Sequence, residues 1–525
     1  MDFQVIFVST RGFVLEVSDG VFFAREDYQI LVNGNVYDET DHVVHTVYGL
    51  EPDHEYEISV RMGTECSPVR KVHTEKEFVT LNVKEFGAKG DGKGDDTLFI
   101  QTAINVCPPG GRVYIPEGEY KIYGLFLKSH MVLEMEKNAV LSAYCDRKAL
   151  PILPGMIQSQ DGTAEYNPGT WEGDPEPMFL SVINGFAVED VVITGGGTID
   201  GNAQQGDWWE EPRKKVGGAY RPRMIFLNRC KNVTVFGITV KNSPSWTLHP
   251  YFSENIRWMD MKVLNPETSP NTDGINPDSS KNVDVIGLEI SVGDDCMAIN
   301  SGRYYMGNKY KTPSENIMVR QCYMRKGHGS VVIGSAMAGG VRHVRCEKCL
   351  FEGTDRGLRI KTKRGRGKDA VVEDICFKDI RMERVKTPFV VNSFYFCNEP
   401  DGESEYVQCK SPLPVDEKTP HIKDLTFENI TATDCQVAAA YIYGLPEAKI
   451  ELLEMKNIKV SFAENAKADY PAMMLDVEWC CKKGIYINNV HKLLLEQIEV
   501  SGADGKQIEL NNIDQISEGC TYLKR

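Results

Sequence analysis

The sequence predicts an all-β chain, most of which forms a β-helix, a solenoid of stacked strand-containing coils. Short apolar segments recur at roughly 20–35 residues, a period typical of repeat architectures. They share the pattern charged residue, Asn, apolar, polar, apolar, and we expect the Asn to turn the chain between coils, in the left-handed conformation or by bonding its own backbone. Clear copies begin at Lys231, Glu254, Lys281 and Glu315 (with an apolar exception at Met318), and fainter copies begin near Arg342, Val372, Ile422 and Ala448. A chain of 525 residues is too long for one ordinary domain unless it is such a repeat array.

Residues 1–78 are predicted to form a separate, small β-sandwich. The expected strands are Phe3–Val8, Phe13–Val17, Tyr28–Val32, Val43–Tyr48 and Tyr56–Met62. The segment Leu50-Glu51-Pro52-Asp53-His54-Glu55-Tyr56 resembles the Leu-x-Pro-x-x-x-Tyr turn of fibronectin type III domains. In those domains the Tyr hydroxyl bonds back to the backbone. No chemistry is expected here, and the module is interpreted as a spacer or as a wall beside the functional site.

The β-helix is predicted to occupy residues 79–525 and to begin with a cap. A glycine-rich stretch precedes an expected helix at Leu98–Val106, with Asp96 or Thr97 as its N-cap. No Gly-Lys-Ser/Thr closes that stretch, so it is not a phosphate-binding loop. A solenoid needs a polar-faced cap on its first coil. Residues 83–120 resemble the opening cap of the right-handed parallel β-helix of pectin-degrading enzymes, and the resemblance implies that fold.

Two insertions interrupt the coils, at Pro151–Pro177 and at Gly206–Arg223. Long connections without regular structure in a compact domain are often functional. The second insertion carries the adjacent Trp208 and Trp209 together with several basic residues. This aromatic pair is expected either to stack on a sugar ring or to pack against the coils.

The net charge and the cysteine content indicate which kinds of partner and which cellular compartment to expect. The formal net charge of −16 gives no overall basic field to attract phosphates, so no nucleic-acid partner is expected. No apolar run is long enough for a membrane span. The 15 cysteines form no disulfide or zinc framework and are interpreted as free thiols. With no signal peptide at Met1–Thr10, we expect a cytoplasmic protein, or an extracellular or periplasmic one if a leader has been removed.

Four polar clusters lie near the ends of successive repeats. They are Asn271-Thr272-Asp273, Gly293-Asp294-Asp295, Gly327-His328-Gly329 and Arg359-Ile360-Lys361. Stacking places equivalent positions on one face, so these clusters are expected to share one patch. Glycoside hydrolysis needs one carboxylic acid to protonate the leaving oxygen and a second carboxylate to activate water or attack carbon. Carboxylates held close together raise one another's pKa, which keeps a proton available.

The four clusters, in this order, resemble the signature of glycoside hydrolase family 28, the polygalacturonases, and the resemblance covers roughly residues 81–444. It implies that Asp294 is the general acid and that Asp273 and Asp295 position and deprotonate the attacking water, with inversion at the anomeric carbon. His328 is then expected to tune the acid by hydrogen bonding. The glycines beside His328 let the backbone approach a ligand closely.

The same resemblance supplies substrate contacts. Arg359 and Lys361 are expected to hold a galacturonate carboxylate, and Asn271 is expected to contact the substrate. The basic residues that follow, from Lys363 to Lys368, are interpreted either as part of this cationic pocket or as a solvated loop. No metal and no cofactor are expected.

Aromatic residues and a histidine are further candidates for substrate contacts. Residues 243–250 resemble the segment found in bacterial exo-acting members, in which Trp246 and His249 are either subsite contacts or core residues. Tyr395 is the candidate for a tyrosine on the catalytic side, with Tyr443 as the alternative, and core packing competes for both.

The sequence therefore predicts an enzyme that cleaves α-1,4 galacturonosidic bonds in polygalacturonate or its oligomers, with exo action favoured by the module, the insertions and the segment around Trp246. Other hypotheses stay open. They are a related hydrolase acting on rhamnogalacturonan or xylogalacturonan, a calcium-dependent pectate lyase, and a non-catalytic β-helix that only binds carbohydrate or serves as a scaffold. The oligomeric state is not predicted.

Overall fold

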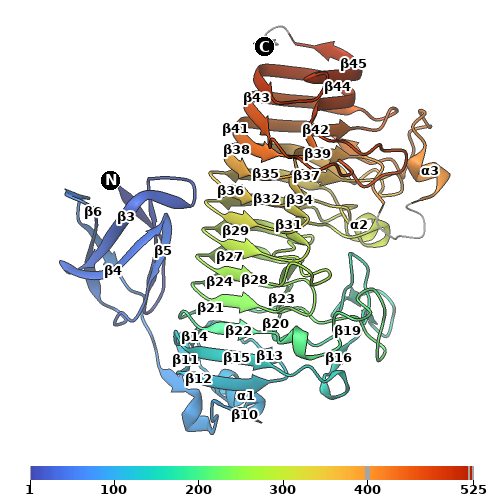
Figure 1. Cartoon of the computed structure of the whole chain (residues 1–525). Helices are drawn as coiled ribbons and strands as arrows, with labels where there is room; N and C mark the ends of the chain where they lie inside the picture. The colour runs from blue at the N-terminus through green and yellow to red at the C-terminus, as the bar shows by residue number, and fades with distance from the viewer. Residues whose placement is uncertain (1, 397–402, 518–520, 523–525) are drawn as a thin grey trace.

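Parallel strands stack along most of the chain in the computed structural model, which describes residues 2–396, 403–517 and 521–522. The stack is a right-handed parallel β-helix, and a small module of antiparallel sheets lies beside it (Figure 1). The predicted fold class is confirmed. Successive coils add strands to three faces of the helix, and the third face carries the candidate site described below.

The strands of each face pair in parallel from one coil to the next. The first face contains β11 (Gly111–Ile115), β14 (Met131–Met135), β21 (Glu189–Thr194), β24 (Lys231–Phe236), β27 (Glu254–Met259), β29 (Lys281–Ile286), β32 (Ser314–Arg320), β35 (Val341–Glu347), β38 (Val371–Glu383), β41 (Asp424–Cys435) and β43 (Ile450–Phe462). The second contains β10 (Asp91–Asp95), β12 (Gly118–Ile122), β15 (Ala139–Ala143), β22 (Thr198–Asp200), β25 (Thr239–Lys241), β28 (Lys262–Leu264), β30 (Glu289–Ser291), β33 (Tyr323–Arg325) and β36 (Leu350–Glu352). The third contains β13 (Leu125–Phe126), β20 (Ile183–Phe186), β23 (Ile225–Asn228), β26 (Leu248–Tyr251), β31 (Asp295–Ile299), β34 (Gly329–Ile333), β37 (Arg356–Lys361), β39 (Thr387–Asn392) and β42 (Ala438–Tyr443).

Near the C-terminus the coils become more regular and the faces merge. The long strand β44 (Lys483–Ser501) pairs with both β42 and β43, and β45 (Ile508–Ile516) and β46 (Thr521–Tyr522) follow it. Between β26 and β31, residues 275–278 continue the third face by isolated bridges. This short bridging segment directly follows Asp273.

The recurrent Asn is what turns each coil. Asn232, Asn255, Asn282 and Asn316 all have positive φ, between 53° and 58°, a conformation that Asn tolerates better than most residues. Their side chains bond to one another rather than to their own backbone. The amide nitrogens of Asn255, Asn282 and Asn316 each donate to the Asn oxygen of the preceding coil, at 2.8–3.1 Å, and that of Asn232 donates to the carboxylate of Asp190 at 2.9 Å. The apolar residue that follows each Asn points into the interior, where Val233, Ile256, Val283 and Ile317 stack in register.

A short helix closes the N-terminal end of the stack, as the sequence predicts. Helix α1 (Thr97–Val106) buries Ile100, Ala103 and Ile104 against the first coil. Asp96 occupies the N-cap position, but its carboxylate accepts from the backbone N–H groups of Lys89 and Gly90 instead of the helix. The acid therefore fixes the glycine-rich loop, and β9 (Thr80–Asn82) pairs with β11 to complete the cap.

The N-terminal module consists of two antiparallel sheets. One contains β1 (Phe3–Val8), β2 (Phe13–Val17) and β5 (Val44–Val47), and the other contains β3 (Phe23–Val32), β4 (Asn35–His42), β6 (Glu55–Met62), β7 (Glu65–Cys66) and β8 (Arg70–His73). The five expected strands are present. Strand β4 was missed because its residues are polar and mostly exposed, so no apolar alternation marks it. The hydroxyl of Tyr56 accepts a hydrogen bond from the backbone N–H of Glu51 at 2.8 Å, as expected for the Leu50–Tyr56 turn.

The module packs against the first face of the β-helix, away from the third face (Figure 1). Phe236, Met259 and Ile286, one from each of three consecutive coils, join the core of the module. Close contact is possible because the coils carry glycine here. A Cβ at Gly287 would lie 2.5 Å from the Cβ of Val44.

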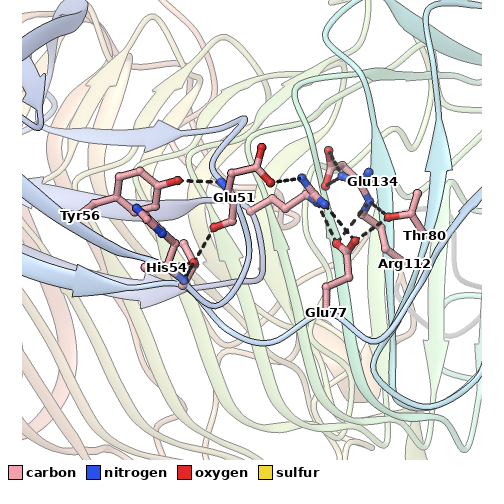
Figure 2. A network of polar contacts seen from close by, with 9 residues as sticks. Glu51, His54, Tyr56, Glu77, Thr80, Arg112 and Glu134 are labelled. Carbon is pink, nitrogen blue, oxygen red and sulfur yellow. Dashed lines mark hydrogen bonds and ion pairs between the residues drawn. The ribbon is translucent and has the colours of Figure 1, made fainter.

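Ion pairs also fix the connection between the module and the first coils (Figure 2). The carboxylate of Glu77, in the connecting segment, accepts from Arg11 of the module at 2.9 Å and lies 3.4 Å from Arg112 of β11. Arg112 in turn reaches Glu134 of β14 at 3.1 Å. Because these groups are mostly buried, the network holds the module at a defined angle to the cap.

The described residues include no helix long or apolar enough to span a bilayer. Every cysteine among them is free, including Cys346 and Cys349, whose sulfur atoms lie 3.9 Å apart.

Candidate active site

The four polar clusters meet on the third face because their coils stack in register. Asp295 is the first residue of β31 and lies opposite Gly329, the first residue of β34. Strand β37 pairs with β34 in the next coil and carries Arg359 and Lys361. The backbone N–H of Gly274, directly after Asp273, donates to the carbonyl of Asp295 at 3.0 Å. Four consecutive layers thus contribute to one place.

A pocket of about 410 Å³ lies over these layers. This volume is within the range of about 300–1,000 Å³ that is usual for small-ligand sites. All but one of the predicted site residues line it. They are Trp246, Asn271, Asp273, Asp294, Asp295, His328, Arg359, Lys361 and Tyr395. No lining residue comes from residues 2–78, so the interpretation of the module as a wall of the site is wrong.

Three carboxylates share the floor of the pocket. One oxygen from each of Asp273, Asp294 and Asp295 lies within 4.8 Å of the other two. Asp295 is almost fully buried and accepts from Lys361 at 2.7 Å and from Arg359 at 3.4 Å. These cations compensate the negative charge of the cluster, so a bare metal ion would have to compete with an ammonium group already bound to Asp295.

This pairing adds a role that sequence reasoning missed. Arg359 and Lys361 were expected to hold a substrate carboxylate, but in the structure both contact Asp295. Both also lie near the ring of Tyr395, at 5.6 Å and 5.3 Å from its centroid. They still line the pocket, so they can attract an acidic ligand while balancing the negative charge of Asp295.

Asp273 differs from its neighbours in its protonation. Burial and then the negative charges of Asp294 and Asp295 raise the pKa of Asp273 well above its usual value. Its Oδ2 accepts a hydrogen bond from the side-chain amide of Asn276 at 2.9 Å. Among the three aspartates, Asp273 is therefore the one whose burial and neighbours most favour the neutral, protonated form.

Asp294 and His328 form an ion pair at the more exposed side of the cluster. Their Oδ1 and Nδ1 atoms are 3.3 Å apart. Burial opposes ionisation of Asp294, but the hydrogen bond and charge of His328 and the charges of Lys361 and Arg359 outweigh it, so the pKa of Asp294 lies below its usual value. The hydrogen bond to Asp294 also raises the pKa of His328 to about 9, against the opposing effect of burial. At neutral pH the pair holds one proton, on the imidazole.

This proton can be followed directly. In an NMR titration the ring of His328 is expected to change charge at about pH 9, and Asp294→Asn is expected to return the midpoint towards about 6.5. Because folding raises this pKa, the pair stabilises the fold fully below about pH 6.5 and loses that effect as the pH rises through about 9. The ring is 54% exposed, so high salt should reduce the shift. A midpoint near 6.5 in the unaltered protein would contradict the ion pair.

Glycines allow the close approach of these loops. Gly327 has φ +93°, and a Cβ there would lie 2.5 Å from the carbonyl oxygen of Asp294. A Cβ at Gly293 would lie 2.1 Å from the carbonyl oxygen of Ser269. Gly293 and Gly327 are thus glycines because backbone of the preceding loop occupies the space that a side chain would need.

His249 does not reach the pocket. Its side chain has no exposed surface, and Nε2 lies 3.6 Å from Oδ2 of Asp278. Its ring packs edge-on against Trp246, at 5.0 Å between centroids. Burial lowers the pKa of His249 to about 4, so the ring is neutral. The structure thus favours the core interpretation for His249 and places Trp246 alone at the pocket.

Of the other aromatic candidates, only Tyr395 lies at the pocket. Tyr443 packs in a distinct apolar cluster with Phe394 and Tyr486, so Tyr395 is the tyrosine at the pocket. Trp208 is buried under the cation of Arg147, whose guanidinium carbon lies 4.0 Å from the ring centroid. The Trp208–Trp209 pair therefore does not form a sugar platform.

The basic run after Lys361 is not a solvated loop. Lys363, Arg364 and Arg366 are all buried. Arg364 pairs with Glu447 at 2.6 Å through Nε and at 2.9 Å through Nη2. Only Lys368, half exposed and paired with Glu417, fits the surface interpretation.

Sequence reasoning missed several residues of the pocket wall. They are Glu172 and Arg213, which come from the two insertions, Arg303, which precedes α2 (Tyr304–Tyr310), Asp355 and Arg356, which lie at the start of β37, and Met473. The insertions could be recognised from composition, but nothing in the sequence showed which of their residues face the site. Met473 belongs to a third long connection, between β43 and β44, whose composition is unremarkable.

Comparison with known proteins links this site to a family of enzymes. The sequence model of glycosyl hydrolases family 28 matches residues 150–481, and that of a pectate lyase-like family, described as rhamnogalacturonase A/epimerase, matches residues 80–133. A probable polygalacturonase of Vitis vinifera is 31% identical over 412 residues, which cover 77% of each chain. A polygalacturonase of Chamaecyparis obtusa is 27% identical over 76% of this chain and 70% of its own.

Solved structures agree in fold. A family 28 exopolygalacturonase of Yersinia enterocolitica matches with a TM-score of 0.70 at 20% identity and covers 98% of both chains, including the N-terminal module. A hyperthermoactive exopolygalacturonase of Thermotoga maritima matches with a TM-score of 0.62 at 26% identity, over 82% of this chain and 91% of its own.

Proposed function

Because the chain belongs to glycosyl hydrolases family 28, we propose that it hydrolyses α-1,4 galacturonosidic bonds of polygalacturonate or its oligomers, and that it does so from a chain end. The observation that carries this proposal is the pocket in which three aspartates, a protonated histidine and two fixed cations lie together. Acid, base and a binding site for an acidic sugar are the parts that this reaction requires. The names of the similar proteins support the same substrate.

The leaving oxygen receives its proton from the Asp294–His328 pair. Asp294 lies at the accessible side of the cluster, with His328 beside it as a proton source. The imidazolium of His328 passes its proton to Asp294, and as the C1–O bond breaks the carboxyl of Asp294 donates that proton to the departing glycosidic oxygen, which leaves the imidazole neutral. A bound sugar displaces water that screens the charges of the neighbouring carboxylates. Their repulsion of a charged Asp294 then becomes stronger, and the neutral acid form of Asp294 is favoured.

The attacking water is activated deeper in the pocket. Asp295, held by Lys361 and Arg359, is a buried acceptor that can take a proton from water as the oxygen bonds to C1. Its engagement with both cations makes direct attack on carbon unfavourable, and Asp273 can orient the same water. We therefore propose inversion. The carboxyl oxygens are closer than the separation of about 6.5–9.5 Å usual for inverting enzymes, so the anomer of the product needs direct measurement by ¹H NMR.

Exo action is supported by the walls of the pocket. Glu172 and Arg213 come from the two insertions, Arg303 stands at the start of α2, and Met473 comes from the connection before β44. Walls on several sides favour entry of a chain end over passage of a long polymer. The exopolygalacturonase from Thermotoga maritima, at 26% identity, supports this mode.

One digestion tests the proposal. An oligogalacturonide labelled at its reducing end is incubated with the protein, and product sizes are followed over time. One small species released from the start is the expected result, whereas a spread of intermediates would contradict exo action. If the protein preferred rhamnogalacturonan or xylogalacturonan, that polymer would be its substrate instead of polygalacturonate. An unsaturated product that absorbs in the ultraviolet would indicate a lyase. No cleavage of any of these would favour a binding protein.

We also propose that the N-terminal module is a fibronectin type III-like domain. Its two antiparallel sheets and the bond between Tyr56 and the backbone of Glu51 support this assignment. Its strand order and edge-to-edge pairing can be checked by comparison with an experimental structure of residues 1–78.

For the compartment we propose the reducing cytoplasm, supported by the free state of every described cysteine. Fractionation of the producing cells tests this, and recovery of activity outside the cytoplasm would contradict it.

A further inference from the structure

Two arginines lie behind the wall of the pocket, entirely inside the protein. Arg221 and Arg223 end the second insertion, and their exposed fractions are 1% and 0%. Among the described residues neither forms an ion pair, and their donors reach only carbonyl, amide and hydroxyl oxygens. Burying a charge without a counter-ion is costly. The presence of two such buried arginines therefore indicates a role other than packing.

Arg223 connects the first insertion to the pocket wall. Its guanidinium carbon lies 4.9 Å from the ring centroid of Trp171, in the first insertion, and 4.7 Å from that of Trp246, which lines the pocket. Nη2 donates to the carbonyl of Thr170 at 3.2 Å, and Nη1 donates to the hydroxyl of Ser245 at 2.5 Å. The cation is thus held between two aromatic faces that belong to separate parts of the wall.

Arg221 connects the second insertion to the loop that carries Asn271 and Asp273. Its Nη2 donates to the carbonyl of Pro212 and to Oδ1 of Asn271, both at 2.7 Å. Its Nη1 donates to the carbonyls of Pro244 and Pro270, at 2.7 Å and 2.8 Å. One planar guanidinium therefore fixes three segments at once, which a lysine ammonium cannot reproduce.

The two insertions are also attached to each other. The rings of Trp171 and Tyr220 stack at 4.6 Å with an interplanar angle of 6°. Lys215 and Glu176 form an ion pair at 2.6 Å. The insertions therefore form one wall rather than two independent loops.

The tip of the first insertion has its own attachment at the rim. Arg303 binds Glu172 and Asp174, each at 3.0 Å, and its backbone N–H donates to the carbonyl of Gly173 at 2.9 Å. A Cβ at Gly173 would lie 2.8 Å from the Cβ of Ala336, so the tip packs closely against Ala336 and leaves no room for a side chain at this position. The wall is thus attached at its base by buried arginines and at its tip by an ion pair.

We propose that Arg221 and Arg223 are positioning residues that hold the two insertions as a fixed wall, and that this wall restricts the pocket to the end of a galacturonate chain. This role of the two arginines rests on the proposed function, because it explains why cleavage would occur only at a chain end. It also predicts that the first insertion is a rigid part of the site and does not act as a mobile lid.

Arg223→Lys and Arg221→Lys test this, because each keeps the charge but loses the planar set of donors. Arg364→Lys is the matched control, since Arg364 is equally buried and binds carbonyls and Glu447 outside the pocket lining. Two measurements are made on the full chain. One is the product sizes from the labelled oligogalacturonide, and the other is hydrogen exchange of the backbone amides in residues 151–177.

Both lysine variants are expected to lose protection in residues 151–177 and to release intermediates of several sizes. The preference for the terminal bond is expected to fall about tenfold or more, since small misplacements at a site have effects of this order. Arg364→Lys is expected to retain a single product. If a lysine variant fails to fold, the double change Glu172→Gln and Asp174→Asn decides the matter, because those side chains are only partly buried and their loss frees the tip.

Folded variants that still release one species would overturn the inference, as would unchanged exchange of residues 151–177. Equal loss of selectivity in Arg364→Lys would also overturn it, because the effect would then follow from general destabilisation. Failure of the proposed function is recognised separately, from the unaltered protein alone, as no cleavage or as intermediates from the start.

Discussion

Asp294→Asn is expected to lower kcat on polygalacturonate by about 10³-fold, the size of effect that a positioned general acid produces. The amide keeps the shape of the side chain and can still accept from the backbone N–H of Asp295, which lies 3.0 Å from Oδ1 in the native protein. It cannot carry a transferable proton. The fold should be retained, as judged by circular dichroism, and thermal unfolding should shift only by the contribution of the partly exposed Asp294–His328 ion pair.

The role of Asp294 is separated from that of Asp273 by the choice of leaving group. A galacturonide with a phenolic leaving group departs without full protonation, so Asp294→Asn should lose far less activity on it than on polygalacturonate. Asp273→Asn should lose a similar factor on both substrates, because water still has to be positioned. If Asp294→Asn lost equal activity on the two substrates, the general acid would be another residue, and Asp273, whose pKa is raised by burial and by the two neighbouring carboxylates, would be the first alternative.

Lys361→Met is expected to destabilise the protein by about 3–5 kcal/mol, since it leaves a buried carboxylate without its nearest cation. Asp295 accepts from Lys361 at 2.7 Å, whereas its contact with Arg359 is longer, at 3.4 Å. Activity should fall as well, because the base loses its orientation and the substrate loses a positive charge. Urea unfolding measures the loss of stability, and the rate of polygalacturonate hydrolysis measures the loss of activity.

The double variant Lys361→Met with Asp295→Asn is the control for this interpretation. It should recover most of the stability without recovering activity, because neither member of the buried pair then carries charge. Lys378→Met removes a partner of the partly exposed Glu428 and should cost far less stability. An equally small loss in Lys361→Met would show that Asp295 does not depend on the lysine.

The fold could be predicted because its signals are local and repeated. The charged residue–Asn–apolar pattern recurs in each coil, and the structure shows that the Asn turns the chain and that the next residue enters the core. The same repetition predicts that Asp273, Asp294 and Arg359 lie on one face. Strand β4 shows the limit of this approach, since a polar strand has no apolar pattern to detect.

The site was predictable in its composition but not in its internal pairing. Sequence spacing shows that Lys361 and Asp295 come from neighbouring layers, but not that the ammonium lies 2.7 Å from the carboxylate. Likewise, the protonation of Asp273 depends on burial and on the distance to two other acids, which only three-dimensional structure provides. The roles of Arg221 and Arg223 were hidden for a related reason, because a basic residue in a polar insertion is expected to be exposed.

The stacked architecture also determines how this protein can change in length. Each layer of the site comes from a different coil, from the segment after Asp273 through β31 and β34 to β37. A duplicated coil inserted between any two of them would separate their side chains by a further ~4.8 Å along the stack, the spacing of adjacent strands, and would abolish contact between acid, base and cation. Coils gained or lost beyond β44 would leave those distances untouched. Over evolutionary time the middle of the stack is therefore fixed in its number of turns, whereas its C-terminal end is free to lengthen or shorten.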